Sequence, residues 1–313
     1  MLYLTTRSAT DAFTANRALT QDCGPDGGLY IPFRMPSFNQ QELQSILECD
    51  DCSIIAQILN LFFTSKLNTW DVEFCVGKNP LRIQTPFRKS LVAEAWHNPG
   101  NEYIYAVASL NNRLNNLSNA PLKSWTRIAV GIAYAFCIYA KAIRENIIHS
   151  EETFDVCVLD GDLSLPAAMV YAKQMGLPIE NVIICSHENS AIWDLINHGQ
   201  LTTGLLNATQ KQEMERFIYC LLGSEQAAAY QSACERRGMY VVPEEMADVL
   251  HGFLFASVVS NERVSSVSEN VLKVSGYDLS PNAAVCYAGI QDYRSKTGQG
   301  SRVFLFSTTP QKA

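Results

Sequence analysis

Residues 154–185 read FDVCVLDGDLSLPAAMVYAKQMGLPIENVIIC, and this stretch decides the fold. The run 154–159 is almost entirely apolar, which is typical of a buried strand, and a loop that contains glycine follows it. Residues 166–175 have the composition of a helix that Gly176 can end. Residues 181–185 supply a second buried strand. A strand, a helix and a strand at this spacing predict one right-handed βαβ unit of a parallel sheet.

The composition is that of an ordinary globular chain. The 313 residues are 47% hydrophobic, which is enough to bury a sizeable core. The net charge is -7, and no run of lysine or arginine is present, which argues against a nucleic-acid or anionic-membrane surface. We expect a small molecule or another protein as partner, and we leave a homodimer open.

Cysteine usage indicates a reducing compartment. Several of the ten cysteines, including Cys157 and Cys185, lie in apolar runs, where a reduced thiol behaves as a small hydrophobic group. Polar residues follow Met1 closely, so we expect no secretory signal. We also expect no stretch that is long and apolar enough to span a bilayer. These features predict a cytoplasmic protein.

Apolar periodicity predicts further elements along the chain. Residues 123–144 are apolar nearly all round, which indicates a largely buried helix of about six turns. The last predicted strand covers residues 301–307. Six other segments are predicted as helices: 37–47, 53–63, 212–222, 224–237, 242–253 and 261–275.

Several segments resemble one known family. The opening MLYLTTR (1–7) and CGPDGGLYIP (23–32) look like the N-terminal signature of threonine synthases, which use pyridoxal phosphate. The runs AKQMGLPI (172–179), MERF (214–217) and FSTTPQK (306–312) are similar to later segments of that family. The resemblance implies an α/β fold with an open, mostly parallel twisted sheet flanked by helices, as in the large domain of fold-type-II pyridoxal phosphate enzymes.

The residue that anchors the cofactor in that family has no counterpart here. Threonine synthases carry a segment Glu-Leu-Phe-His-Gly-Pro-Thr-Leu-Ala-Phe-Lys-Asp, whose lysine forms a Schiff base with pyridoxal phosphate. The matching stretch is EAWHNPGNEYIY (94–105), which places Ile104 at the lysine position. A branched alkane cannot form an imine. His97 would line any surviving pocket, although a hydrogen-bonded histidine in a turn is the favoured interpretation.

The predicted phosphate loop has changed as well. The family's Ser/Thr-Gly-Asn-Phe-Gly-Asp loop holds the cofactor phosphate at a helix N-terminus, where backbone amides favour an anion. Here Gly161 survives, Ser164 replaces the second glycine, and Asp160 and Asp162 add two carboxylates. A carboxylate about 4 Å from a phosphate charge costs about 4 kcal/mol at an effective dielectric constant of about 20. The loop is therefore expected not to bind the phosphate.

One more position matches the cofactor site of the family. Ser307 corresponds to the hydroxyl residue that meets the pyridine nitrogen of the cofactor. With Gly161 it would be a vestige of cofactor binding, while a serine at a strand end is the favoured interpretation. The resemblance places Ile104, His97, Asp160 and Asp162 around a vestigial pocket.

The same resemblance suggests three parts of the chain. Residues 1–104 form the N-terminal threonine-synthase-like segment with helices, and residues 118–313 form the α/β core. Residues 105–117 are a short connection in place of the small domain that closes over substrate in the family. We expect that small domain to be largely missing.

Other candidate sites carry weak signals. Lys89 and Lys173 are the lysines near the matched segments, but neither is expected to replace the missing lysine. Cys49 and Cys52 have the spacing of a metal or redox pair, yet no second pair or histidine accompanies them. We predict no metal site.

The sequence leaves two functions of different class. The preferred hypothesis is a pseudoenzyme, a threonine-synthase-like protein that binds no cofactor and acts as a binding or regulatory protein. The alternative is an active pyridoxal phosphate enzyme of amino-acid biosynthesis that converts O-phosphohomoserine to threonine with an unrecognised lysine. A third option is a small anion or amino acid in the vestigial pocket, where the two carboxylates favour an ammonium-bearing ligand over a phosphorylated one.

Overall fold

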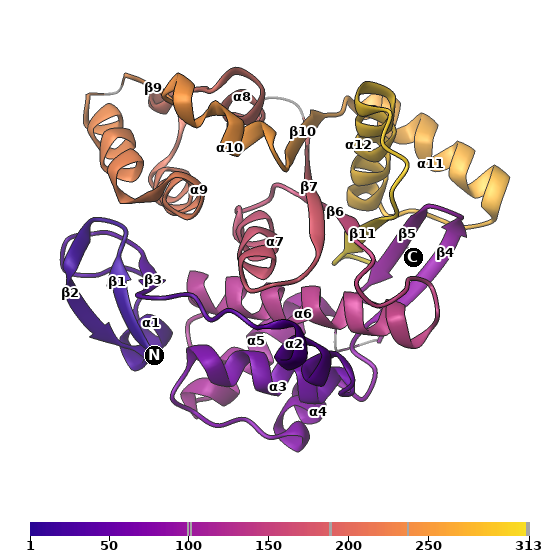
Figure 1. Cartoon of the computed structure of the whole chain (residues 1–313), viewed down its shortest axis with the longest axis horizontal. Coiled ribbons are helices and arrows are strands. Elements are labelled where there is room, and N and C mark those ends of the chain that lie inside the picture. Colours follow the sequence, from indigo (N-terminus) through magenta and orange to yellow (C-terminus); the bar gives the residue numbers. More distant parts are fainter. Residues whose placement is uncertain (99, 101, 188–189, 237, 311–313) are drawn as a thin grey trace.

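The centre of the molecule is a six-stranded, mostly parallel sheet (Figure 1). The computed structural model describes residues 1–98, 100, 102–187, 190–236 and 238–310. In spatial order the strands are β10 (Leu254–Val258), β7 (Ile179–Ser186), β6 (Phe154–Leu159), β11 (Val303–Ser307), β5 (Ser90–Glu94) and β4 (Arg82–Phe87). Neighbouring strands run parallel except for the antiparallel pair β4 and β5. The predicted fold class is confirmed.

The predicted βαβ unit lies in the middle of this sheet. Strand β6 leads through a loop into helix α7 (Ser164–Gln174) and then into β7. The two strands pair in parallel, with Val158 opposite Ile184. Gly176, after the helix, has φ of +112°, a value that glycine adopts without strain.

Helices cover both faces of the sheet because successive residues of each strand point in opposite directions. Val156, Val158 and Phe304 pack into the core with α7 and with helix α6 (Ser124–Arg144). Cys157 and Leu305 point to the other face, where helices α11 (Asn261–Ser275) and α12 (Pro281–Thr297) cover them. Figure 1 shows α11 and α12 together on one side of the sheet. The side chains on both faces of the central strands are therefore buried.

Helix α6 is the predicted long apolar helix. By length and composition it is the one helix among the described residues that could cross a membrane, which corrects our expectation that no stretch meets that test. In the structure, however, 83% of its most apolar stretch is buried inside the protein. It is packed as the core helix of a globular fold.

The N-terminal segment packs against α6. Helices α2 (Gln40–Leu47) and α3 (Asp51–Phe62) confirm the two predicted helices, and the side chains of Asn39 and Asp50 cap their first turns. Helix α4 (Thr69–Val76) follows. The turn-rich opening contains a small antiparallel sheet of β1 (Leu2–Thr5), β2 (Ser8–Thr14) and β3 (Tyr30–Pro32), together with helix α1 (Ala15–Thr20).

Between β5 and α6 the described residues form one regular element, helix α5 (Tyr103–Asn115). Ala106, Leu110 and Leu114 on this helix are buried in the same core as α6. The segment predicted as a short connection is thus largely a packed helix of 13 residues.

One predicted element in the second half was wrong. Residues 242–253 are not one helix: they contain a short 3-10 turn (Glu244–Met246) and α10 (Ala247–His251), and β10 begins directly afterwards. A short apolar run does not distinguish a strand from a helix until its neighbours are known, and here β7 supplies the neighbour. The two helices predicted at 212–222 and 224–237 are confirmed: they share the label α9 (Ala208–Glu235), but Gly223 between them has a non-helical φ of +86°.

Further elements of this half were not predicted. Helix α12 covers the sheet, and β8 (Gln200–Thr202) and β9 (Met239–Val241) form a separate two-stranded antiparallel sheet. Helix α8 (Ala191–His198) packs next to β10 and β8.

Candidate functional site

The loop that follows β6 is bent tightly around its two carboxylates. Gly161 and Leu163 both have positive φ, +46° and +60°. Asp160 accepts a hydrogen bond from the Gly161 amide at 2.8 Å and another from the Ser190 hydroxyl at 3.1 Å. Both loop carboxylates are therefore engaged by protein donors, since Asp162 has partners of its own.

Asp162 lies at the N-terminus of α7. Its carboxylate accepts a hydrogen bond from the Ser164 amide at 3.1 Å and forms an ion pair with Arg127 of α6. Burial raises the pKa of Asp162, but the hydrogen bonds from Arg127 and the Ser164 amide outweigh it, and the net pKa is lowered. A protein carboxylate thus occupies the end of the helix that favours an anion.

The first cavity lies between this loop and the start of α5, and we call it the α5 cavity. Its volume is about 480 Å³. Apolar side chains form most of its wall: Tyr103, Ile104, Tyr105, Val107, Leu122 and Leu165. The polar residues in its lining are Glu102, Arg127, Asp162, Ser164, Thr308 and Thr309. Ile104 is 66% exposed, so the cavity is open at that side.

A second cavity, of about 300 Å³, lies on the other side of the same loop. Asp160, Gly161 and Asp162 line it together with the first turn of α9. In that turn burial raises the pKa of Glu213, whose carboxylate pairs with Arg216. Three carboxylates near this cavity make it unsuited to an anion.

The structure brings some of the predicted site residues together and separates others. Ile104 and Asp162 line the α5 cavity, while Asp160 and Gly161 line the second cavity. His97 and Ser307 line neither. The predicted pocket is therefore divided by the loop that was expected to hold a phosphate.

Ser307 is engaged by a tryptophan. The Trp96 indole nitrogen donates a hydrogen bond to the Ser307 Oγ at 3.0 Å, and that hydroxyl donates to the Thr309 carbonyl at 3.4 Å. His97 lies in the same turn, with its Nδ1 3.1 Å from the Glu94 carbonyl. Burial lowers the pKa of His97. His97 is thus hydrogen-bonded in a turn, which was the favoured interpretation of the sequence.

No lysine in the described part of the chain lines either cavity. Lys89 is exposed in the turn between β4 and β5. Lys173 donates to the Ile179 and Glu180 carbonyls, and burial lowers its pKa. Lys312, in the last matched segment, lies outside the described residues.

The cysteine pair at positions 49 and 52 is not assembled as a site. Cys49 Sγ faces the Ser45 carbonyl at 3.5 Å, and Cys52 Sγ faces the Gly77 carbonyl at 3.3 Å. All ten cysteines are free thiols. Among the described residues, sulfur atoms of three buried cysteines, 157, 185 and 286, lie within 4.8 Å of one another, a grouping that the sequence did not indicate.

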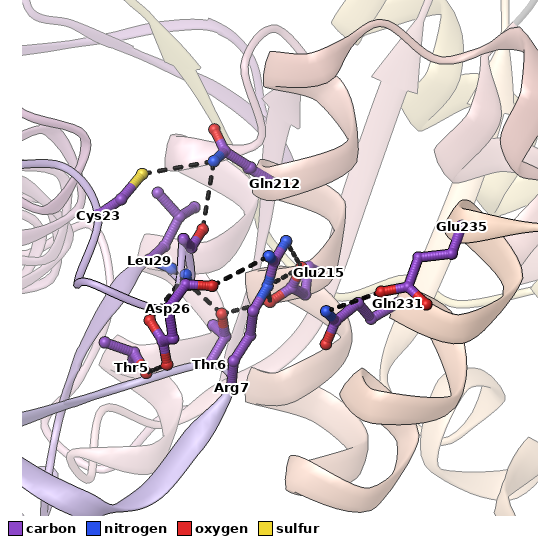
Figure 2. Close-up of polar contacts among 12 residues, drawn as sticks. Thr5, Thr6, Arg7, Cys23, Asp26, Leu29, Gln212, Glu215, Gln231 and Glu235 are labelled. Atoms are coloured by element: carbon purple, nitrogen blue, oxygen red, sulfur yellow. Dashed lines mark hydrogen bonds and ion pairs between the residues drawn. The ribbon is translucent and has the colours of Figure 1, made fainter.

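Three matched segments far apart in the sequence meet in what we call the N-terminal clamp (Thr6, Arg7, Asp26 and Glu215). Figure 2 shows Thr6 and Arg7 pointing toward Glu215 on α9. Arg7 Nη2 lies 2.8 Å from Glu215 Oε2, and Arg7 Nη1 donates to the Asp26 carbonyl at 3.3 Å. Glu215 is only 3% exposed. The clamp fixes the N-terminal sheet to the second half of the chain.

Comparison with known proteins supports a relationship to threonine synthases. A model of the threonine synthase N terminus matches residues 2–79, which include β1 to β3 and two parts of the clamp. The chain is threonine-synthase-like. Relatives include threonine synthase-like 1 of Pongo abelii, 23% identical over 54% of this chain and 24% of that protein. Threonine synthase-like 2 of Rattus norvegicus is 23% identical over 64% of this chain and 43% of that protein.

Solved threonine synthases have the same fold. The pyridoxal-phosphate-bound enzyme from Brucella melitensis aligns over 99% of this chain and 89% of its own with a TM-score of 0.83. The yeast enzyme aligns over 98% and 87% with a TM-score of 0.82. Each is 15% identical to this chain, so the likeness concerns the fold alone. This chain spans only about a quarter of the length of the threonine synthase-like 1 relatives that it matches, from 24% to 26%.

Three residues of the site were missed at the sequence level. Arg127 lies 35 positions from Asp162, and Trp96 lies 211 positions from Ser307. Glu102 lies inside the matched segment, but nothing in its spacing marked it. The charge of Arg127 in the apolar first half of α6 was a signal that could have been used, because a partly buried cation needs a partner.

Proposed function

We propose that this protein is a non-catalytic member of the threonine synthase family that does not hold pyridoxal phosphate and acts as a binding or regulatory protein. The observation that carries the proposal is the position of Asp162. Its carboxylate takes the anion position at the N-terminus of α7 and neutralises Arg127, the nearby cation. A cofactor phosphate at this helix end would face that carboxylate at close range.

Two further observations support the proposal that the site does not fit pyridoxal phosphate. Ile104 stands at the position of the Schiff-base lysine and presents an aliphatic side chain to the α5 cavity. The Ser307 hydroxyl, which would meet the pyridine nitrogen, already accepts a hydrogen bond from Trp96. These observations support a site that does not suit the cofactor: no described lysine lines either cavity, and the Asp162 carboxylate and the Ser307 hydroxyl already have protein partners.

The free thiols are consistent with a reducing compartment such as the cytoplasm. Cys157 and Cys185 point to the same face of the sheet with their sulfur atoms 3.5 Å apart, and they remain unbonded. Disulfides form and persist in oxidising compartments. Localisation of the tagged protein in cells tests this part of the proposal.

The direct test is incubation of the purified protein with excess pyridoxal phosphate, followed by visible spectroscopy. We expect no absorption band of an internal aldimine. A band that borohydride removes, with the reduced adduct mapped by mass spectrometry to one lysine, would sink the proposal. The variant Ile104→Lys should be measured in the same way. We expect no aldimine band from it either, because Asp162 remains.

The second candidate is an active threonine synthase. The fold shared with the Brucella melitensis and yeast enzymes favours it. Of the lysines in the matched segments, Lys173 bonds to backbone carbonyls and lines neither cavity, and Lys312 lies outside the described residues. Complementation of a threonine auxotroph separates the two candidates: growth supports the enzyme, and no growth with normal expression supports the binding protein.

A further inference from the structure

The α5 cavity has the size and lining of a small-molecule site. A volume of about 480 Å³ falls in the range of ligand pockets, which are mostly apolar with a few polar groups that fix orientation. Tyr103, Ile104, Tyr105 and Leu165 provide the apolar surface. Tyr103 is held in place by ring contacts with Tyr134 and Phe306, so this wall is fixed before any ligand arrives.

Two polar atoms in the lining of this cavity are buried and have no hydrogen-bond partner among the described residues. They are Glu102 Oε2 and Ser164 Oγ. Glu102 precedes α5 but makes no capping bond to that helix. Buried polar atoms in native structures are normally paired, and leaving a carboxylate oxygen unpaired is costly. A ligand that donates a hydrogen bond in this cavity would satisfy the Glu102 oxygen.

The charges around the cavity select the sign of that ligand. Arg127 is neutralised by Asp162, while Glu102 forms no ion pair among the described residues. An ionised carboxylate accepts hydrogen bonds but donates none. The lining therefore carries one uncompensated negative charge, which attracts an ammonium group and repels a phosphate or a carboxylate.

We propose that the α5 cavity binds a compound with one ammonium group on an apolar body, the ammonium on Glu102 and the body against Tyr103, Ile104 and Leu165. This inference rests on the proposed function, because it requires the cavity to be free of pyridoxal phosphate. It names the class of ligand that a binding protein of this shape would take.

The test compares three ligands of nearly equal shape by calorimetric titration of the whole chain. They are 2-phenylethylammonium, the neutral 2-phenylethanol and the anionic 3-phenylpropionate. We expect saturable one-to-one binding of the amine, at least about tenfold tighter than the alcohol, and no binding of the anion, since a charge-assisted hydrogen bond is about twice as strong as a neutral one. Equal binding of amine and alcohol, or no binding of the amine, would overturn the inference.

Variants locate the site. Glu102→Gln should remove the preference for the amine over the alcohol. Glu225→Gln, the same change at an exposed position of α9, should leave that preference intact. If Glu102→Gln keeps the preference, the inference is wrong.

A second variant does not depend on Glu102. Ile104→Lys changes an exposed side chain and supplies a tethered ammonium to the same cavity, so it should abolish binding of the free amine. Undiminished amine binding by this variant contradicts the assignment of the site. An aldimine with pyridoxal phosphate in the wild type would overturn the proposed function as well, whereas absent amine preference without an aldimine overturns this inference alone.

Discussion

The N-terminal clamp and the loop after β6 both lie in segments that resemble threonine synthases. By that resemblance, the clamp keeps the family's residues and the loop does not. In the clamp, Arg7 and Glu215 keep the residues of the matched segments and make direct contacts at 2.8 Å. In the loop, one glycine is left and two carboxylates have been added. By the resemblance, the chain keeps one set of signature residues and differs at another.

The difference follows from what each set contacts. The clamp residues contact one another and connect β1 to α9, so they stabilise the fold whether or not a cofactor is present. The loop residues of a threonine synthase would contact a phosphate, and in its absence nothing in the fold requires glycine at Ser164. The comparison therefore separates residues that hold the chain together from residues that serve a ligand.

The largest effect is expected from breaking the clamp. Glu215→Ala removes a buried carboxylate and leaves Thr6 and Arg7 without their acceptor, which should lower the free energy of unfolding by about 2 to 4 kcal/mol. Urea denaturation followed by circular dichroism measures it. Glu225→Ala on the same helix is the control and should change stability by less than about 0.5 kcal/mol. A loss as small as the control's would show that the clamp is not structural.

A smaller effect is expected at Ser307. Trp96→Phe keeps an aromatic ring but removes the indole donor, so it should cost about 0.5 to 1.5 kcal/mol, the usual range for one hydrogen bond. Ser307→Ala removes the acceptor of the same bond. In a double-mutant cycle the two losses should not add, and full additivity would contradict the contact.

The loop should tolerate substitution better than the clamp. The side chains of Arg127 and Asp162 are 42% and 40% exposed, and ion pairs of that exposure contribute up to about 1 kcal/mol. Asp162→Asn should therefore lower the free energy of unfolding by no more than that, measured by the same urea titration. A loss as large as that of Glu215→Ala would remove the distinction between the two regions.

The smallest effect concerns pH. The pKa of Asp162 is lowered in the folded protein, because the hydrogen bonds from Arg127 and the Ser164 amide outweigh burial. Its contribution is fully present above the unfolded pKa of about 3.9 and is lost as the pH falls through the lower, folded pKa. The stability difference between wild type and Asp162→Asn should be constant near neutral pH and shrink below about pH 4. A difference that grows on acidification would contradict this sign.

Local patterns predicted the central part of the fold. Strands β6 and β7, helix α7 between them and the long helix α6 followed from apolar runs and from glycine and proline at their ends. Strand β10 did not, since a mostly apolar run of five residues after a helical pattern becomes a strand only by pairing with β7. The small N-terminal sheet was missed because its position depends on distant contacts, such as the bond from the Tyr3 hydroxyl to the Phe62 carbonyl.

Only part of the candidate site could be predicted from the sequence. The resemblance located Ile104 and Asp162, and the structure places both in the lining of one cavity. The resemblance could not locate Arg127, because the packing of α6 on α7 sets its contact with Asp162. It also could not predict that Ser307 accepts a hydrogen bond from Trp96. The resemblance predicts which ligand groups are lost, but the contacts of the side chains at those positions depend on the folded arrangement.

The most direct measurement is a calorimetric titration of the wild-type protein with pyridoxal phosphate, which detects binding whether or not an imine forms. With Asp162 at the anion position of α7, we predict no saturable one-to-one binding in the micromolar range. Stoichiometric micromolar binding would contradict the central claim that this site no longer holds the cofactor.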